Sequence, residues 1–368
     1  MTVQDIQHII ESWAPREIAW ERDNVGLQAG DPAHSVRRIL VALDATPQVV
    51  EEARKKKVDL IVTHHPLLFR PLLSVTTRDR AGMIATQLVR NGIALYSAHT
   101  NLDFVPGGVS HALAERLGLK KIQVLSRMEG ALKKVVAFVP QDYVDKVMEA
   151  MAAAGAGIIG KYDQCSFRLE GTGTFRAREG ARPFLGEVGK FERVSEYRLE
   201  VVVPKWRMRE ALQAMRSAHP YEEIAYDVYP LDNELPEYGA GAYGELPAQM
   251  TLKGFLKRVK EELHAPMLRH VGDPNGRVRI VAVCGGSGGD LLETAVRVGA
   301  HVFVTAELKY HDFEAAQNRI ALIDAGHFET EQFCVAALIR HLQQHVERTK
   351  EDVEILRALS MSNPIQYF

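Results

Sequence analysis

Residues 60–66 read LIVTHHP, an apolar run that stops abruptly at two adjacent histidines. A short apolar run rich in β-branched residues predicts a strand that is buried on both faces. Another apolar run, residues 39–43, precedes it, and a helical pattern over about residues 47–57 lies between the two. The order strand, helix, strand predicts neighbouring parallel strands and therefore an α/β fold.

The same order of strand and helix recurs close to the C-terminus. The segment DLIVT at 59–63 matches HVFVT at 301–305 in its pattern, and NGIAL at 91–95 matches NRIAL at 318–322 almost residue for residue. Self-similarity of this kind indicates a degenerate internal repeat. We therefore expect two related α/β halves that face each other.

The residues between the two halves follow a different order. Over residues 129–246 the expected elements read β-α-β-β-α-β, which is the ferredoxin-like arrangement. The exit, LPEYGAG at 235–241, is rich in proline and glycine, as a domain boundary often is. We therefore expect an α/β domain made of residues 1–128 and 247–368, interrupted by an inserted ferredoxin-like α+β domain.

Composition limits the function classes. The 368 residues include 45 Lys and Arg against 47 Asp and Glu, a formal net charge of -2, so no overall positive field attracts nucleic acid. Three widely separated cysteines without a paired spacing indicate a reducing compartment. No apolar stretch approaches the ~20 residues that a membrane span needs. We expect a cytoplasmic protein that binds neither membranes nor nucleic acid.

Histidines and carboxylates gather where predicted strands end. His64 and His65 follow the first such run, Asp103 follows a second one, and His327 and Glu331 follow a third. In open α/β sheets ligands bind outside the carboxyl ends of the strands, so these segments predict a single site. Imidazole and carboxylate groups together suit Zn, Mn, Fe, Co or Ni. The five residues are therefore candidate metal ligands, although a structural role is the commoner one for each residue taken alone.

The spacing within this set leaves an alternative open. Adjacent residues of a regular strand point to opposite faces, so either the backbone turns at His64 and His65 or each histidine serves a different ion. The second option suits a centre of two cations. His327 and Glu331 are four residues apart and share one face if a helix has begun by His327.

Other polar residues near the expected site are candidates for catalysis or substrate contact. His99 could orient a ligand or donate a proton, and a purely structural histidine is the alternative. Glu329 could move protons. Glu307, Lys309 and His311 follow the strand that mirrors residues 59–63, and they could contact the substrate or belong to a solvated loop.

Taken together, these segments resemble the NIF3-like family, also called the GTP cyclohydrolase I type 2 or DUF34 family. The motifs that carry the resemblance are WERDNVGLQ at 20–28, VTHHPLLF at 62–69, AHTNLD at 98–103, VTAELKYHD at 304–312 and DAGHFETE at 324–331. The resemblance implies two divalent metal ions per subunit, bound by His64, His65, Asp103, His327 and Glu331, with Glu331 as the bridge. It also implies a toroidal homohexamer whose metal sites face an internal cavity.

The middle of the chain carries a resemblance of its own. Residues 219–227, HPYEEIAYD, resemble the PII-like or CutA-like insertion of the longer family members, a module that tends to form trimers. Two positions depart from the family pattern, since Ala306 stands where glycine is usual and Ile224 where proline is common. None of the implied metal ligands is missing.

Two hypotheses about function follow. The first is a metal-dependent hydrolase that acts on a purine nucleotide such as GTP. The alternative is a non-catalytic metal-binding ring that senses a small molecule, a nucleotide or a protein partner through its PII-like insertion.

Overall fold

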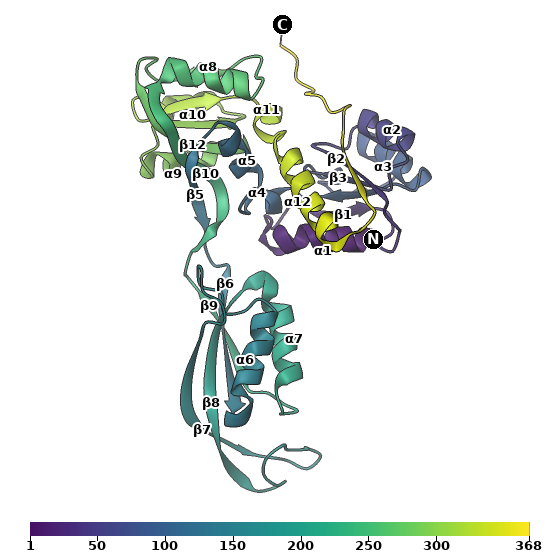
Figure 1. Ribbon diagram of the computed structural model, residues 1–368, viewed down its shortest axis with the longest axis vertical. Helices are drawn as coiled ribbons and strands as arrows, with labels where there is room; N and C mark the ends of the chain where they lie inside the picture. The colour runs from purple at the N-terminus through teal and green to yellow at the C-terminus, as the bar shows by residue number, and fades with distance from the viewer. Residues whose placement is uncertain (368) are drawn as a thin grey trace. The chain divides into compact units, whose positions relative to one another are not determined.

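The computed structural model describes residues 1–367, which form two compact units (Figure 1). The larger unit combines residues 1–127 with the residues from 236 onward, and the smaller unit contains residues 128–235. The smaller unit ends before the exit expected at 246, because β10 (Leu235–Thr251) pairs with a strand of the larger unit.

The first sheet of the larger unit brings three parallel strand ends to one level. Its strands are β1 (Gly26–Ala29), β2 (Arg38–Ala42), β3 (Leu60–Thr63), β4 (Ala94–Ser97) and β15 (Glu354–Arg357). They follow the order β1-β4-β3-β2-β15, with β1 antiparallel and the others parallel. Ala42 pairs with Thr63, and Thr63 pairs with Ser97. The residues that follow β2, β3 and β4 therefore meet at one edge of the sheet.

Several helices precede, connect or follow the strands of this sheet. They are α1 (Val3–Trp13), α2 (Pro47–Lys55), α3 (Arg80–Arg90), α4 (Thr100–Asp103), α5 (Val109–Arg116) and α12 (Cys334–Thr349). Helix α1 begins with a capping box, in which Asp5 N donates to Thr2 Oγ1 (3.2 Å) and Thr2 N donates to Asp5 Oδ2 (2.7 Å). Helix α12 contacts both α1 and α5 (Figure 1).

The second sheet of the larger unit is built from both ends of the chain. Its strands are β5 (Lys120–Met128), β10, β11 (Arg269–Val271), β12 (Arg277–Ser287), β13 (Val302–Ala306) and β14 (Ala321–Asp324), in the order β11-β14-β13-β12-β10-β5. Strands β12, β13 and β14 are parallel, whereas β11 and β10 are antiparallel to their neighbours. The accompanying helices are α8 (Leu252–Glu262), α9 (Leu292–Arg297), α10 (Tyr310–Ala316) and α11 (His327–Glu331).

Each of the two sheets contains a run of parallel strands flanked at one edge by an antiparallel strand, as a repeat would produce. The parallel run is β4-β3-β2-β15 in the first sheet and β14-β13-β12 in the second. The sheets are nevertheless not made from separate halves of the sequence. Strand β15, from the C-terminal segment, joins the first sheet, and β5, from the N-terminal segment, joins the second. This exchange pairs backbone groups of β2 and β10 that would otherwise lie at exposed sheet edges.

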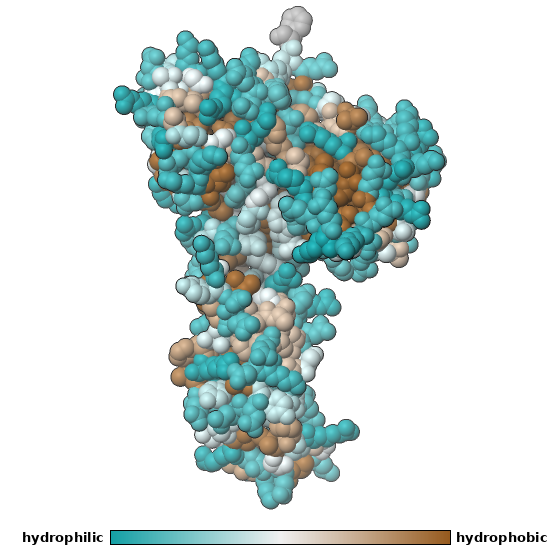
Figure 2. Space-filling model, viewed as in Figure 1, coloured by the Kyte–Doolittle hydropathy of each residue, from teal (hydrophilic) through white to brown (hydrophobic). Residues whose placement is uncertain are grey.

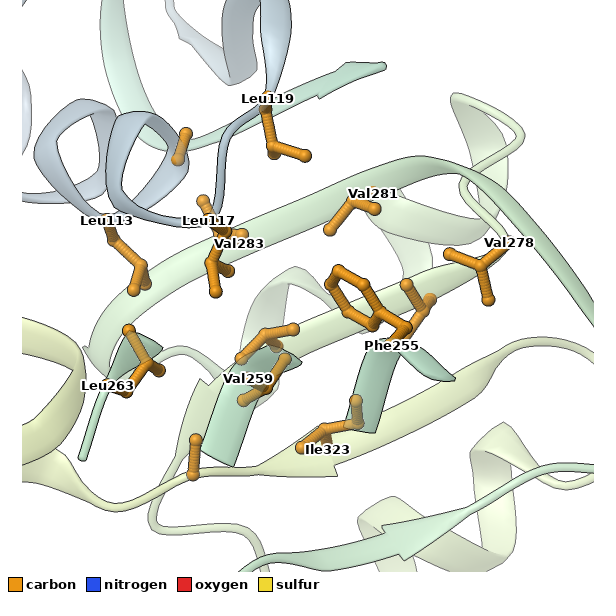
Figure 3. Close-up of a cluster of buried hydrophobic side chains, with 14 of the residues drawn as sticks. Leu113, Leu117, Leu119, Phe255, Val259, Leu263, Val278, Val281, Val283 and Ile323 are labelled. Carbon is orange, nitrogen blue, oxygen red and sulfur yellow. The ribbon is translucent and has the colours of Figure 1, made fainter. Parts of the chain in front are cut away.

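The core of the second sheet contains Ile323, which is fully buried among aliphatic side chains and Phe255 (Figure 3). Replacing Ile323 by valine removes one buried methylene group, so we expect the free energy of unfolding to fall by about 1 kcal/mol. Denaturant titration followed by circular dichroism measures this change. The same substitution at Ile365, which is 54% exposed, is the matched control and should leave the free energy of unfolding within about 0.5 kcal/mol of the original value.

The smaller unit is an antiparallel sheet with two helices. The strands are β6 (Leu132–Pro140), β7 (Ser166–Arg176), β8 (Phe191–Pro204) and β9 (Tyr226–Leu231), in the order β7-β8-β6-β9. Helices α6 (Val144–Ala153) and α7 (Met208–Ala218) share a hydrophobic core with β6 and β8. That core uses alternate residues of these strands, so the intervening side chains lie on the opposite face of the sheet.

The surface visible in Figure 2 is mainly hydrophilic, with scattered hydrophobic patches. Over residues 1–367, no helix combines the length and the apolar character that crossing a membrane requires.

Candidate metal centre

The two adjacent histidines follow the end of β3. The hydroxyl of Thr63, the last residue of the strand, donates a hydrogen bond to the His65 carbonyl oxygen (2.8 Å). This contact stabilises a turn, and the ring centroids of His64 and His65 lie 4.9 Å apart. The chain therefore turns at the histidine pair, so both rings reach the same side of the sheet edge.

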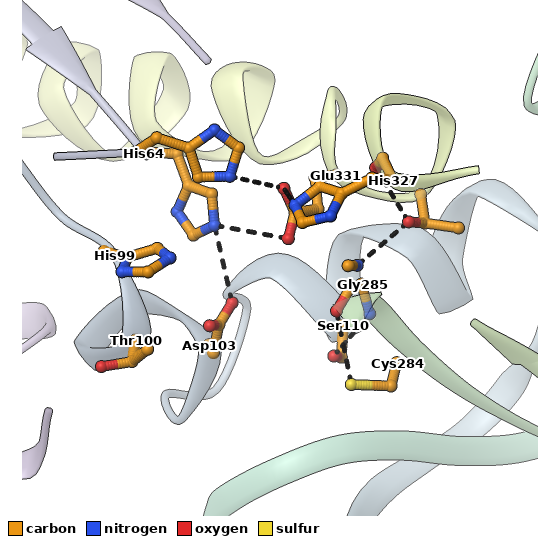
Figure 4. Close-up of polar contacts among 12 residues, drawn as sticks. His64, His99, Thr100, Asp103, Ser110, Cys284, Gly285, His327 and Glu331 are labelled. Atoms are coloured by element: carbon orange, nitrogen blue, oxygen red, sulfur yellow. Dashed lines mark hydrogen bonds and ion pairs between the residues drawn. The ribbon is translucent and has the colours of Figure 1, made fainter. Parts of the chain in front are cut away.

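Glu331 lies at the centre of a cluster of imidazoles (Figure 4). Helix α11 begins at His327, so His327 and Glu331 share one face, as their spacing requires. The Oε2 atom of Glu331 lies 2.9 Å from His65 Nε2 and 2.9 Å from His327 Nε2. Its Oε1 atom lies 3.8 Å from His64 Nε2. One carboxylate oxygen thus faces two imidazoles, and the other faces a third.

A glycine at the end of β12 makes room for this carboxylate. A Cβ atom at Gly286 would lie 2.2 Å from Glu331 Oε1. Gly286 also adopts a φ of 64°, in the left-handed region that favours glycine. Any larger residue at this position would displace Glu331 from the cluster.

Asp103, at the end of α4, completes the predicted ligand set. Its Oδ1 atom lies 3.8 Å from His64 Nε2. Burial, together with the nearby charge of Glu331, raises the pKa of Asp103 to about 7. All five predicted ligands are thus brought together, from both ends of the chain.

Each of the four histidines of the cluster has its Nδ1 atom bound to an oxygen atom. The partners are the Ala98 carbonyl for His64 (2.8 Å), Asp44 for His65 (2.9 Å), Asp23 for His99 (2.9 Å) and Glu307 for His327 (2.8 Å). Because these oxygens accept hydrogen bonds, a neutral ring carries its proton on Nδ1 and keeps the Nε2 lone pair free. Metal-binding histidines in proteins are usually oriented in this way.

The arrangement fits divalent cations. His64 Nε2 is buried and has no hydrogen-bond partner among residues 1–367, a costly state for a polar atom unless a ligand is bound. The ligand atoms of His64, His65 and His99 lie within 4.8 Å of one another, and so do those of His65, His327 and Glu331. Nitrogen and oxygen atoms grouped in this way suit ions such as Zn, Mn, Fe, Co or Ni.

At least two imidazoles of the cluster hold their protons tightly. Burial lowers the pKa of His65, but its hydrogen bonds to Asp44 and Glu331 outweigh burial and raise the pKa to about 10. For His327, burial is likewise outweighed by the contact with Glu331, and the pKa rises to about 9. The same contacts lower the pKa of Glu331 well below its usual range, against the effect of burial. A metal ion bound here would therefore have to displace protons from at least two imidazoles.

Two carboxylates of the site were not predicted from the sequence. Asp44 lies shortly after β2, at the same sheet edge as the histidine pair, and its position after an apolar run was a usable signal. Asp23 precedes β1 and accepts hydrogen bonds from the backbone N–H (3.0 Å) and hydroxyl (2.5 Å) of Thr100 as well as from His99. Asp23 lies within the motif at 20–28 that carries the family resemblance, but no periodic pattern assigns it a partner, because His99 and Thr100 come from a segment that is distant in the sequence.

Replacing Asp44 by alanine tests whether these oxygens orient the ligands. The His65 ring would lose its Nδ1 partner and its fixed orientation, so we expect metal affinity to fall about 10- to 100-fold. Titration against a chromophoric chelator measures the affinity. The exposed Asp352 provides the matched control, and its alanine variant should bind metal as the unmodified protein does.

The remaining candidates occupy different places. Glu307, proposed as a substrate contact, is a partner of His327, with a φ of 56° that non-glycine residues rarely adopt. Lys309 precedes α10, where its backbone N–H donates to Asp312 Oδ2 (2.6 Å), and the 85% exposed His311 bonds through Nδ1 to Glu314 (2.9 Å). The structure therefore joins Glu307 to the cluster but gives Lys309 and His311 contacts of their own.

Glu329 is buried, but its polar contact leads away from the imidazoles. It lies two residues from His327 and two from Glu331, and its Oε1 atom accepts a hydrogen bond from Asn363 Nδ2 (2.8 Å). This partner comes from the C-terminal segment and not from the ligand set. The placement gives no support to the predicted role of Glu329 in proton transfer.

Comparison with known proteins places this geometry in context. The family model described as Duf34/NIF3 (NGG1p interacting factor 3) matches residues 1–364. A Bacillus subtilis protein named GTP cyclohydrolase 1 type 2 homolog is 40% identical over 366 residues, 99% of this chain and 98% of the relative. A Mycobacterium tuberculosis protein of the same name is 41% identical over 333 residues, 89% of this chain and 87% of the relative.

Solved structures agree with these sequence matches. The crystal structure of a Bacillus cereus protein related to NIF3 superimposes with a TM-score of 0.87 at 39% identity, covering 100% of this chain and 99% of the other. A Staphylococcus aureus protein superimposes with a TM-score of 0.80 at 31% identity, again covering 100% and 99%. The mixed α/β fold with several sheets is therefore shared over the full length of these chains.

Proposed function

Because the chain belongs to the Duf34/NIF3 family, we propose that it binds two divalent metal ions and uses them as a hydrolase. The observation that carries this proposal is the convergence of imidazole Nε2 atoms on Glu331, each ring being held through Nδ1. The ligands would be His64, His65, Asp103, His327 and Glu331, with Glu331 between the two ions. Zn, Mn, Fe, Co and Ni suit this mixture of nitrogen and oxygen atoms.

The proposed substrate is a purine nucleotide such as GTP, as the name of the relatives suggests. Divalent ions bound here would supply the Lewis acidity that hydrolysis requires. Beside them, His99 is suited to hold a proton at Nε2, because its Nδ1 atom is bound to Asp23. Burial raises the pKa of Asp23, but hydrogen bonds from His99 and Thr100 outweigh burial and lower the pKa to about 2. Asp23 is thus a carboxylate at neutral pH and keeps the His99 ring in place.

Turnover of GTP and related nucleotides by Mn- or Zn-loaded protein tests the proposal. The comparison is a His64→Ala/His65→Ala double variant, which removes two ligands from the same turn. We expect turnover in the loaded protein and none above background in the variant. Equal turnover in both would show that hydrolysis does not depend on this centre.

We further propose a cytoplasmic toroidal homohexamer, with residues 128–235 as a ferredoxin-like insertion of the PII or CutA type. The antiparallel order β7-β8-β6-β9, with α6 and α7 on one face, supports the insertion, and free Cys165, Cys284 and Cys334 agree with a reducing compartment. Light scattering coupled to size-exclusion chromatography measures the assembly, for which we expect six copies of the chain.

A regulatory protein is the second candidate function, favoured by a cavity in the smaller unit. In that case the metal centre would be structural, and residues 128–235 would sense a small molecule. Absence of nucleotide turnover in fully metal-loaded protein, together with ligand binding to the smaller unit, would favour this alternative.

A further inference from the structure

The smaller unit contains a cavity of about 750 Å³ on the face of its sheet that lies opposite α6 and α7. It lies between β7, the segment that follows β7, and β8. All of its lining residues belong to the smaller unit, so it has no part in the metal centre.

Aromatic and aliphatic side chains form most of its wall. Phe138, Leu169 and Phe184 line it, and the Phe184 ring centroid lies 5.5 Å from that of Tyr143 and 6.2 Å from that of Tyr221. The segment that carries Phe184 is anchored, because the backbone N–H of Arg182 donates to Glu222 Oε1 (2.7 Å). The wall is therefore mainly apolar, although charged side chains such as Arg176 and Arg178 also line the cavity, and the apolar part suits the flat body of a small molecule.

One buried carboxylate faces this apolar space. Glu196 is only 8% exposed, and its Oε1 atom accepts a hydrogen bond from the Tyr221 hydroxyl (2.8 Å). The nearest arginine of its own strand, Arg198, is directed to another acid, since its Nε lies 3.0 Å from Glu200 Oε1. A buried charge whose partner is a neutral hydroxyl is costly, and a cationic ligand would offset that cost.

Two glycines in the interior of β7 leave room above the strand, which is open at Gly171 and is filled by the Glu196 side chain at Gly173. Gly171 is the cross-strand partner of Glu196, and a Cβ atom there would have no neighbour within 4 Å. A larger residue would fit at Gly171, so packing within the unit does not explain the glycine. Glycine at this position also weakens the strand. At Gly173, a Cβ atom would lie 1.9 Å from Glu196 Oε2, so glycine lets the carboxylate rest against the strand. The open surface of β7 at Gly171 can therefore contact a ligand that lies beside the Glu196 carboxylate.

We propose that this cavity binds a flat, largely apolar molecule bearing a protonated amine, with the amine paired to Glu196. The apolar body lies over Gly171 against Phe184, and the ammonium group donates to the carboxylate beside Tyr221. This assigns a site and a ligand class to the regulatory alternative, but it does not depend on metal binding.

Two probes that share an indole ring and differ in charge test the proposal on the full-length protein. They are tryptamine, a cation, and indole-3-propionate, an anion, and isothermal titration measures both. A hydrogen bond to a charged group changes affinity by at least about tenfold. We therefore expect tryptamine, whose ammonium group can pair with Glu196, to bind about tenfold more tightly than indole-3-propionate. Glu196→Gln, which keeps the shape and the acceptor for Tyr221, should bring the two affinities within about twofold of each other.

Three further variants test whether tryptamine binds in this cavity and independently of the metal centre. Gly171→Val fills the floor without a clash and should weaken tryptamine binding, whereas Glu149→Gln, which removes a charge from the exposed surface of α6, should not. The His64→Ala/His65→Ala variant should bind tryptamine normally, so failure of the metal proposal is distinguishable from failure of this one. Absence of saturable tryptamine binding at millimolar concentration, or an unchanged preference in Glu196→Gln, overturns the proposal.

Discussion

Glu331→Gln protein is expected to bind divalent metal at least about 100-fold more weakly than the unmodified chain, and to lose both ions together. Glu331 approaches three imidazoles, at 2.9 Å from His65 and His327 and at 3.8 Å from His64. Glutamine keeps the size of the side chain but replaces one oxygen by an N–H donor group and removes the charge. If Glu331 bridges the two ions, its substitution weakens the binding of both. Substitution of a residue that binds one ion would weaken the binding of that ion alone. Metal content after dialysis against buffered free metal measures the loss.

The same helix supplies the control for this experiment. Glu329→Gln makes an identical chemical change two residues away, at a buried carboxylate that contacts Asn363. Its metal content should stay at the original level. Loss of metal in both variants would point to a disturbed helix α11, and full metal content in Glu331→Gln would remove Glu331 from the ligand set. Thermal unfolding of metal-free protein shows whether either variant has lost stability independently of metal.

The extent to which this centre was predictable follows from the parallel sheet. His64 and His65 end an apolar run, and the register Ala42–Thr63–Ser97 brings the residues after neighbouring strands to one edge. An apolar run followed by polar residues marks the carboxyl end of a buried parallel strand, and this pattern is visible in the sequence alone. The orientation of each ring is different, because it depends on oxygens such as Asp23 that belong to segments without periodic pattern. The residues that converge at this edge were therefore visible in the sequence, and the hydrogen bonds that orient them were not.

The exchange of β5 and β15 between the two sheets escaped prediction for a related reason. A repeat in the sequence predicts two similar sheets, but it does not say which edge strand completes each of them. Edge pairing is decided by contacts between distant segments, such as Ile355 with Ile39. In the smaller unit the order of strands and helices was expected, yet the cavity depends on Phe184, which lies between β7 and β8 where no periodic pattern guides prediction.

Metal affinity is expected to rise about 100-fold for each pH unit between about pH 7 and pH 9, and to level off near pH 10. In the metal-free protein the pKa values of His65 and His327 are about 10 and about 9, so both rings carry protons at pH 8. When metal binding releases one proton, the apparent metal affinity rises about tenfold per pH unit, and when it releases two, the affinity rises about 100-fold. Titrations in a metal-buffering chelator at several pH values measure the slope, and a weakly buffered solution with an indicator measures the protons released. A slope of zero would mean that no proton leaves when metal binds.

The stability of metal-free protein should depend on pH more steeply than the stability of metal-loaded protein. The folded-state pKa values of His65 and His327 lie above the ordinary value of 6.5, so the folded chain binds more protons than the unfolded chain between these limits. The contribution of these two groups to the stability of metal-free protein is therefore complete below about pH 6.5, and it is lost as pH rises through about 9 and about 10. In metal-loaded protein these two rings carry no extra proton, and above about pH 6.5 the same rings of the unfolded chain carry none either, so their contribution to the stability of metal-loaded protein changes little over the same window. Melting temperatures with chelator and with metal should thus diverge as pH rises, and parallel curves would contradict the assignment of these imidazoles as ligands.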